Sequence, residues 1–207
     1  MQREAFIEAC RQGGERIEAA LLALDRAYAA KLIRTALRSV RDRGVAEDIV
    51  QAVLVRAWQR CAQFRGDSEV IAWLTSILRN QIIDHLRSID PEEPLEDETG
   101  DPTVAVAKTL AESSTGRIAT PERDLERKEV ADCLVRQYTK FQERFPLHAS
   151  VMQWVCEDGL KSEDVAALLG RTPGATREFI SQARKKARLY FAECHALAFG
   201  AEKDEER

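Results

Sequence analysis

The 207-residue chain lacks most of the signatures that mark enzymes, metal proteins and membrane proteins. It contains no P-loop, GxGxxG, HExxH or GxSxG motif, and its three histidines lie in separate segments, so no catalytic residue or cofactor is predicted. No apolar run approaches the roughly 20 residues of a membrane-spanning helix, and the N-terminus has no apolar core of a secretory signal. These absences predict a non-enzymatic cytoplasmic protein without a membrane span.

Cysteine is scarce and scattered along the chain. The five cysteines include no CxxC pair and stand far apart: Cys10, Cys61, Cys133, Cys156 and Cys194. The adjacent Cys194 and His195 are poorly spaced for binding one metal ion. The pattern therefore predicts neither a zinc site nor a disulfide framework, in keeping with a reducing compartment.

Neither sign of charge dominates, because 31 Lys and Arg oppose 35 Asp and Glu for a net charge of −4. As an average, this value argues against nucleic-acid binding. The charge is unevenly spread, however. Residues 31–88 carry ten basic and six acidic side chains, 159–190 carry seven and three, and 90–101 carry seven acidic and no basic ones. Two basic modules are therefore predicted on either side of an acidic segment.

Apolar residues recur at spacings of three and four along nearly the whole chain, which predicts an all-α fold. Between residues 89 and 119, clustered acidic residues and prolines do not favour a packed core. We therefore predict two small helical bundles, over 1–88 and 120–199. A flexible acidic linker over 89–119 joins them, and a charged tail follows over 200–207.

Local signals place several of the helices. Between residues 46 and 61 the apolar residues form one stripe, which includes Trp58 and predicts it in the core. Ser68 is predicted to cap the next helix, and Ser162 to cap a short helix of the second bundle. Gly170 then suits a turn with positive φ, and Thr172-Pro173 begins the last helix.

The segment 159–188 has the pattern of a helix-turn-helix, in which the second helix lies in the major groove of DNA. That second helix combines an apolar stripe with a polar outer face. The candidate DNA-binding residues are Arg171, Thr172, Thr176, Arg177, Ser181, Arg184, Lys185 and Arg188. A helical hairpin with a solvated basic face, or a basic helix that binds a protein partner, would show the same pattern.

The first bundle resembles region 2 of the sigma-70 family of bacterial RNA polymerase initiation factors, most closely the extracytoplasmic-function (ECF) group. The resemblance rests on Ala46-Glu47-Asp48, Gln51, Arg56-Ala57-Trp58, Phe64-Arg65-Gly66, Ala72-Trp73-Leu74, Arg79-Asn80 and Ile83-Asp84-His85-Leu86-Arg87. The helix-turn-helix resembles region 4 of the same family. The resemblance implies a transcription initiation factor that binds core RNA polymerase and directs it to specific promoters. The alternative is a conventional helix-turn-helix regulator that does not dock on the polymerase.

By the same resemblance, the first bundle carries two sets of binding residues. Core RNA polymerase is expected to contact Glu47, Asp48, Gln51 and Arg56. The proximal promoter element, which region 2 opens, is expected to contact Phe64, Arg65, Gly66, Trp73, Arg79, Asn80, His85 and Arg87. Core packing remains an alternative for Trp73, and helix capping or surface hydrogen bonding remains one for Asn80 and His85. Region 4 is expected to bind the distal promoter element as duplex, and an anti-sigma protein is implied as a further partner.

The chain departs from the family pattern at three places. Ala52-Val53 stands where an acidic residue and Thr are usual, which predicts a less acidic docking face. Ala149-Ser150 replaces a common Arg-Glu pair, and Glu178-Phe179 replaces a small polar residue and Arg, which predicts a distinct promoter preference. The acidic linker could mimic nucleic acid in a basic cleft of the polymerase, cover a DNA-binding surface, or act as a solvated spacer. Its Ser and Thr residues could also accept phosphate.

Overall fold

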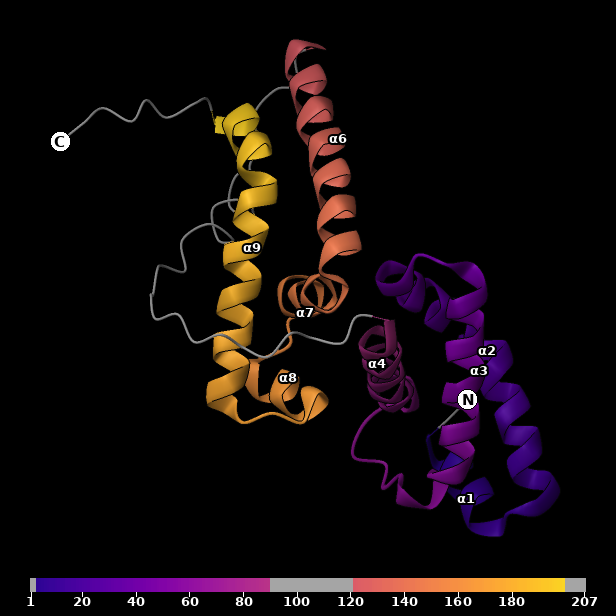
Figure 1. Ribbon diagram of the computed structural model, residues 1–207. Helices are drawn as coiled ribbons and strands as arrows, with labels where there is room; N and C mark the ends of the chain where they lie inside the picture. Colours follow the sequence, from indigo (N-terminus) through magenta and orange to yellow (C-terminus); the bar gives the residue numbers. More distant parts are fainter. Residues whose placement is uncertain (1–2, 90–120, 200–207) are drawn as a thin grey trace. The chain divides into compact units, whose positions relative to one another are not determined.

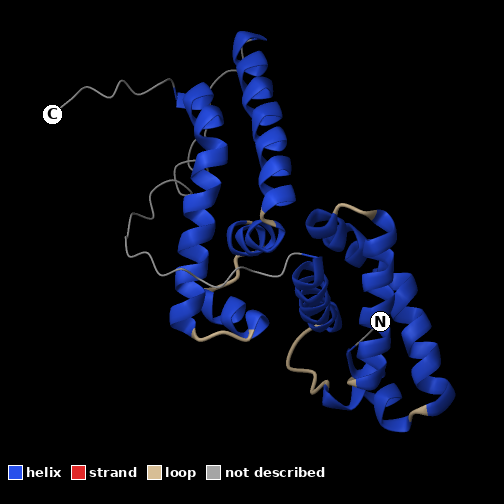
Figure 2. Ribbon diagram, in the orientation of Figure 1, coloured by secondary structure: helices blue, strands red, loops and turns tan. Residues whose placement is uncertain are grey.

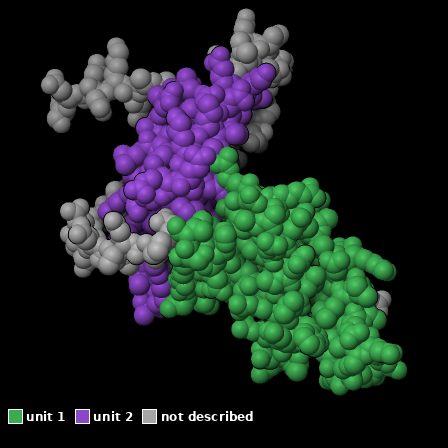
Figure 3. Space-filling view, turned by 45° about the vertical axis from the view of Figure 1, so that its right-hand side comes forward, with its two compact units in different colours: residues 1–92, 167–170 green, residues 93–166, 171–207 purple. Residues whose placement is uncertain are grey.

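A computed structural model of the chain describes residues 3–89 and 121–199. The acidic linker and the charged tail predicted from the sequence lie outside these residues, apart from Ile89. Every regular element of the described residues is a helix (Figures 1 and 2), which confirms the all-α fold class. The chain forms two compact units (Figure 3). The first contains α1 to α4, and the second contains α6, α7, α9 and most of α8.

Three long helices form the core of the first unit. These are α2 (Gly14–Val40), α3 (Arg43–Gln59) and α4 (Val70–Ile89), and each packs against the other two. Fully buried side chains such as Leu32, Val53 and Leu78 lie between them. The short helix α1 (Arg3–Gln12) packs on α2 and on η1, a 3-10 turn over Cys61–Gln63. α1 therefore lies beside the turn that joins α3 to α4.

The ends of these helices follow local capping rules, with one correction. Arg41 takes the left-handed conformation (φ 57°) and donates its N–H to the Leu37 carbonyl, which ends α2. The Asp42 carboxylate then accepts a hydrogen bond from the N–H of Val45 at 2.9 Å and caps α3. The prediction that Ser68 caps the following helix is wrong, because α4 begins two residues later, at Val70.

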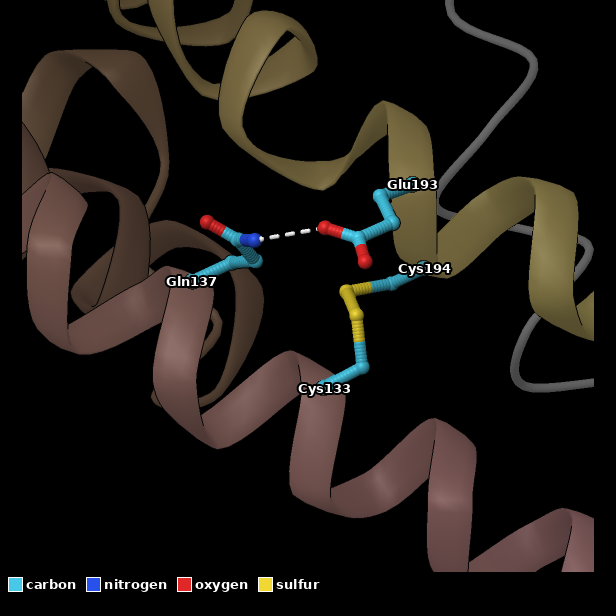
Figure 4. The surroundings of a disulfide bond; sticks show 4 residues. All are labelled: Cys133, Gln137, Glu193 and Cys194. Carbon is cyan, nitrogen blue, oxygen red and sulfur yellow. Dashed lines mark hydrogen bonds between the residues drawn. A yellow bond between two sulfur atoms is a disulfide. The ribbon is translucent and has the colours of Figure 1, made fainter.

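In the second unit, two long helices run antiparallel. They are α6 (Pro121–Arg144) and α9 (Pro173–Phe199), and α7 (Pro146–Cys156) and α8 (Ser162–Leu169) lie between them in the sequence. As residue numbers increase along α6, the numbers of the residues that they contact on α9 decrease. Two of the contacts that show this order are Cys133 with Cys194 and Gln137 with Glu193 (Figure 4). The third is the ring contact of Phe141 with Tyr190.

The cysteines form two disulfide bonds, so the prediction of no disulfide framework is wrong. Cys10 of α1 pairs with Cys61 of η1, and Cys133 of α6 pairs with Cys194 of α9. The paired cysteines are 51 and 61 residues apart in the sequence, respectively. Spacing along the chain does not reveal such pairs, because tertiary packing alone brings the partners together. Cys156 is the free cysteine of the described residues.

Removal of the Cys133–Cys194 bond tests how much it stabilises the second unit. A disulfide that closes a loop of this length lowers the entropy of the unfolded chain. This raises the free energy of unfolding by up to about 4 kcal/mol. We expect Cys133→Ala/Cys194→Ala to accelerate hydrogen exchange of the α6 and α9 amides and to leave that of α3 unchanged. Measurement by mass spectrometry separates the two units, and equal acceleration in α3 would contradict the expectation.

Candidate functional site

One side of α3 is exposed and combines acidic, amide and apolar side chains. Asp48, Gln51, Val55 and Trp58 follow one another at spacings of three, four and three, so they form one stripe along the helix. Glu47 lies at its edge and accepts a hydrogen bond from Arg43 at 2.8 Å. Trp58 is 55% exposed, so the prediction that it lies in the core is wrong. Val53 and Ala57 fill the core positions of this part of α3 instead.

Arg56 does not belong to this stripe. It lies on the side of α3 that faces α4, where its guanidinium pairs with the Asp84 carboxylate at 3.7 Å. Of the four residues predicted to contact the polymerase, the structure therefore gathers Glu47, Asp48 and Gln51 and separates Arg56 from them. Val55, which was not predicted for this surface, and Trp58, which was predicted in the core, complete it.

The turn between α3 and α4 is built around an aromatic cluster. Phe64 is only 7% exposed, and its ring centroid lies 5.0 Å from that of Trp73 and 5.5 Å from that of Phe6 on α1. Arg65 is exposed beside this cluster. Gly66 has a φ of 81°, and a Cβ at this position would lie 2.8 Å from Ile7 of α1, so the turn approaches α1 closely.

On α4 the predicted DNA-binding residues divide between different sides of the helix. Trp73, Asn80 and Arg87 are spaced by seven residues, which places them on one stripe. Arg79 precedes Asn80 by one residue and His85 follows it by five, so neither shares that stripe. The cluster of Phe64 with Trp73 shows that both rings take part in packing, the alternative noted for Trp73.

Four side chains form a polar stripe along the outer side of α9. Arg177, Ser181, Arg184 and Arg188 follow at spacings of four, three and four over about 16 Å of helix. The three arginines are exposed and Ser181 is partly exposed, while the part-exposed Lys185 flanks them. The spacing of these cations allows contacts with successive phosphates or base edges of a duplex.

The start of α9 confirms one prediction and corrects another. The Thr172 hydroxyl accepts a hydrogen bond from the N–H of Ala175 at 3.3 Å, so Thr172 caps the helix as predicted, and Gly170 has the expected positive φ of 64°. Thr176 is fully buried, and its hydroxyl donates to the Thr172 carbonyl at 2.9 Å. Its placement on the outer face is wrong because it follows the buried side of the helical repeat. The prediction that Ser162 caps the short helix is also wrong, because Ser162 is the first residue of α8. The N–H of the preceding Lys161 donates to the Asp164 carboxylate.

Arg171 lies over an aromatic stack at the entrance to α9. Its guanidinium carbon is 4.7 Å from the centroid of Phe179, whose ring also stacks on His148 of α7 at 4.4 Å. Lys186 places its Nζ 3.4 Å from His148 Nε2 and 4.5 Å from the Phe145 ring centroid. Phe179, the residue that departs from the family pattern, thus holds the side chain of Arg171 through a cation–π contact.

Burial of the His148 ring, together with the charges of Lys186 and Arg171, lowers the pKa of His148 to about 4. Both causes disfavour the imidazolium form. At neutral pH the ring is therefore uncharged and serves as an aromatic spacer between α7 and α9.

No group of three or more His, Cys, Asp and Glu side chains within 3–89 and 121–199 is arranged to hold a metal ion. Among the helices of these same residues, none combines the length and apolar character that crossing a membrane requires.

Comparison with known proteins identifies the family of this chain. Residues 24–91, which contain the α3 stripe, the aromatic turn and α4, match the family described as Sigma-70 region 2. The chain is 32% identical over 187 residues to "ECF RNA polymerase sigma factor SigL" of Mycobacterium tuberculosis. The alignment covers 87% of this chain and 94% of that protein. The chain belongs to the ECF group of the sigma-70 family.

Two further relatives extend the comparison. This sigma-family chain is 31% identical over 153 residues to "Probable RNA polymerase sigma factor RfaY" of Xanthomonas campestris pv. campestris, which covers 74% of this chain. It spans only 36% of that relative's length. It is also 25% identical over 158 residues to "RNA polymerase sigma-H factor" of Pseudomonas aeruginosa, which covers 76% of this chain and 79% of that protein.

The sequence patterns did not predict the roles of several residues of this sigma-family chain. Val55 has no motif to mark it, although the spacing Asp48, Gln51, Val55 indicates a shared stripe. The contact of α1 with the aromatic turn, through Phe6, has no local signal at all. The stack of His148 on Phe179 joins positions 31 residues apart, so only the packing of α7 against α9 reveals it.

The lowered pKa of His148 predicts an acid-sensitive second unit. The unfolded chain, with an ordinary histidine pKa of about 6.5, binds more protons than the folded chain between that pH and about 4. The stabilising contribution is therefore complete above pH 6.5 and is lost as the pH falls toward 4. Because the ring is partly solvated, we expect a loss of roughly 1–2 kcal/mol.

Urea unfolding at pH 7 and at pH 4.5 measures this loss, with His148→Phe as the control. The phenylalanine ring can stack on Phe179 but cannot titrate, so the variant should lose less stability on acidification than the parent chain. An equal loss in the two chains would show that His148 is not responsible.

Proposed function

We propose that this chain is a transcription initiation factor that binds core RNA polymerase and directs it to specific promoters, without catalytic activity of its own. The observation that carries the proposal is the region 2 match, because its 68 residues include both the exposed α3 stripe and the aromatic turn with α4. Core polymerase and promoter DNA are its proposed partners, and the cytoplasm is its proposed location. An anti-sigma protein is part of the proposal on family grounds alone.

The α3 stripe is the proposed polymerase-docking surface. It presents the carboxylates of Glu47 and Asp48 beside the exposed side chains of Val55 and Trp58. Acidic groups beside exposed apolar side chains suit a basic partner surface with an apolar pocket. Tryptophan is among the residue types that most often dominate binding energy at such a surface.

The turn after α3 and the stripe on α4 are the proposed site of promoter opening. An unstacked base needs an aromatic face to stack on and cations that follow the phosphates. Phe64 and Trp73 supply the aromatic faces, while Arg65 and Arg87 supply cations at the turn and along α4. Asn80, on the same stripe, offers donors and an acceptor for a base edge.

The stripe on α9 is the proposed reader of the distal promoter element, with α8 and α9 acting as a helix-turn-helix. Exposed Arg177 and Arg184 can pair bidentately with guanine, and Arg188 lies further along the same side. Arg171, placed over Phe179, adds a cation just before α9 begins. The remaining alternative, a regulator that uses only this unit, leaves the docking stripe on α3 without a role.

Two experiments test the proposal. The purified chain should bind core RNA polymerase stably enough to co-elute with it on gel filtration. Mapping of transcript starts after overexpression should then give promoters that share a proximal and a distal element. A chain that binds promoter DNA but never co-elutes with the polymerase would instead be a conventional regulator.

Trp58→Ala should weaken docking without unfolding the chain, because its side chain is 55% exposed. We expect the dissociation constant for core polymerase to rise about tenfold or more, the loss typical of a central aromatic contact. Fluorescence anisotropy of a labelled chain measures the constant. Leu22→Ala is the matched control, because Leu22 is an exposed apolar residue (59%) of a different helix, α2. Equal effects of the two changes would remove Trp58 from the docking surface.

Arg65→Ala should impair promoter opening and leave docking intact. Arg65 is exposed, so its loss disturbs no packing, whereas Trp73→Ala would also damage the cluster with Phe64 and Phe6. We expect open complexes to fall at least fivefold in permanganate footprints of a promoter found by transcript mapping. Arg26→Ala, an exposed arginine change on α2, is the control. Normal opening with Arg65→Ala would contradict the assignment of the turn.

A further inference from the structure

We propose that Cys10 and Cys61 are a reversible oxidation site that locks α1 onto the aromatic turn and so lowers promoter opening. This inference rests on the proposed function, because it assigns a form of regulation to the opening site. Its structural basis is the position of the bond, which joins the last turns of α1 to the 3-10 turn that leads directly into Phe64.

α1 contacts the opening site at three points. Phe6, fully buried, has its ring centroid 5.5 Å from that of Phe64 and 5.8 Å from that of Trp73. Ile7 lies against Gly66, the residue of positive φ in the turn. The third point is covalent, the bond from Cys10 to Cys61. α1 therefore occupies the ring surfaces that a flipped base would need for stacking.

Without the bond, α1 is held by non-covalent contacts alone, chiefly the burial of Phe6 and Ala9. It has only ten residues, and helices this short are marginal in water unless tertiary contacts support them. Gly13 and Gly14, both of positive φ and with open space around their Cβ positions, connect it to α2. Once the bond is reduced, α1 can swing away about these glycines, and Phe64 and Trp73 become accessible to a base.

The two disulfides differ in the access that they give to a thiol reagent. Cys133 and Cys194 are both fully enclosed, at 0% and 1% exposure, whereas Cys10 is partly exposed. Thiol–disulfide exchange requires a thiolate to reach one of the two sulfur atoms. The Cys10–Cys61 bond is therefore the one that responds to the surroundings. In the proposed cytoplasmic location, disulfides are typically transient and redox-sensing.

The chemistry balances with ordinary cellular reagents. Oxidation joins the two Sγ atoms and releases two electrons and two protons, which convert one molecule of hydrogen peroxide into two molecules of water. For reduction, a thiolate of a dithiol attacks the Sγ of Cys10, and Cys61 leaves as a thiolate that takes up a proton. The second thiol of the reductant then resolves the mixed disulfide and restores Cys10 to a thiol.

The test compares one protein in two redox states. The full chain is oxidised with hydrogen peroxide or reduced with dithiothreitol, its free thiols are counted by alkylation and mass spectrometry, and it is combined with core polymerase. Permanganate reactivity of a promoter from the transcript mapping then reports opening. We expect opening to be at least fivefold lower in the oxidised state, with equal binding to the core enzyme.

Two double variants identify the responsible pair. Cys10→Ser/Cys61→Ser should open the promoter like the reduced chain whichever reagent is used, and Cys133→Ala/Cys194→Ala should keep the redox response. Equal opening by the two states of the parent chain, or a response that survives in Cys10→Ser/Cys61→Ser, would overturn the switch while the proposed function stands. A chain that neither binds core polymerase nor opens DNA in either state would overturn the proposed function and the switch together.

Discussion

The burial of one side of each long helix governs what this protein can present to a partner. On α9, Phe179, Ala183 and Ala187 face the core, so the α-helical repeat turns Arg177 and Arg184 outward. Rotation of the helix by one residue would place cations against α6 and α7, and burial of an unpaired cation costs far more than packing could return. The surface stripe is thus as firmly specified as the core opposite it.

The same constraint shapes the charges near the core of the second unit. His148 stands between α7 and α9, close to the cations of Lys186 and Arg171. A charged imidazole there would face both burial and like-charge repulsion, so the ring is held neutral and contributes its aromatic face to Phe179. The positive charge of this unit is therefore kept outside, where a polyanion could use it.

Local rules in the sequence predicted the features that depend on neighbouring residues. The all-α fold, the cap at Thr172, the turn at Gly170 and the outward placement of Arg177 all follow from helix periodicity and capping. The prediction that Thr176 lies on the outer face was wrong for a related reason. A polar residue near the boundary of a stripe gives no sign of which side of the helix it occupies.

Features that depend on tertiary packing could not be predicted. An apolar stripe wider than the contact area leaves some of its members outside, and Trp58 is one of them. The pairing of Cys10 with Cys61, and the contact of Phe6 with Phe64, require knowledge of where α1 lies, which no spacing along the chain records. The contact of Phe179 with Arg171 was not predicted either, although Glu178-Phe179 stood out as a departure from the family pattern.

Because α9 is long, its outward-facing residues and its covalent link to α6 lie on different parts of the helix. Its outward arginines begin at Arg177, whereas its covalent link to α6 is at Cys194, about 25 Å further along the helix. Outward residues in the first half can therefore vary while the scaffold in the second half stays constant. Relatives that share this helix can therefore change the DNA sequence they recognise without changing the fold. The exposed residues of 177–188 could likewise be exchanged between relatives as one segment.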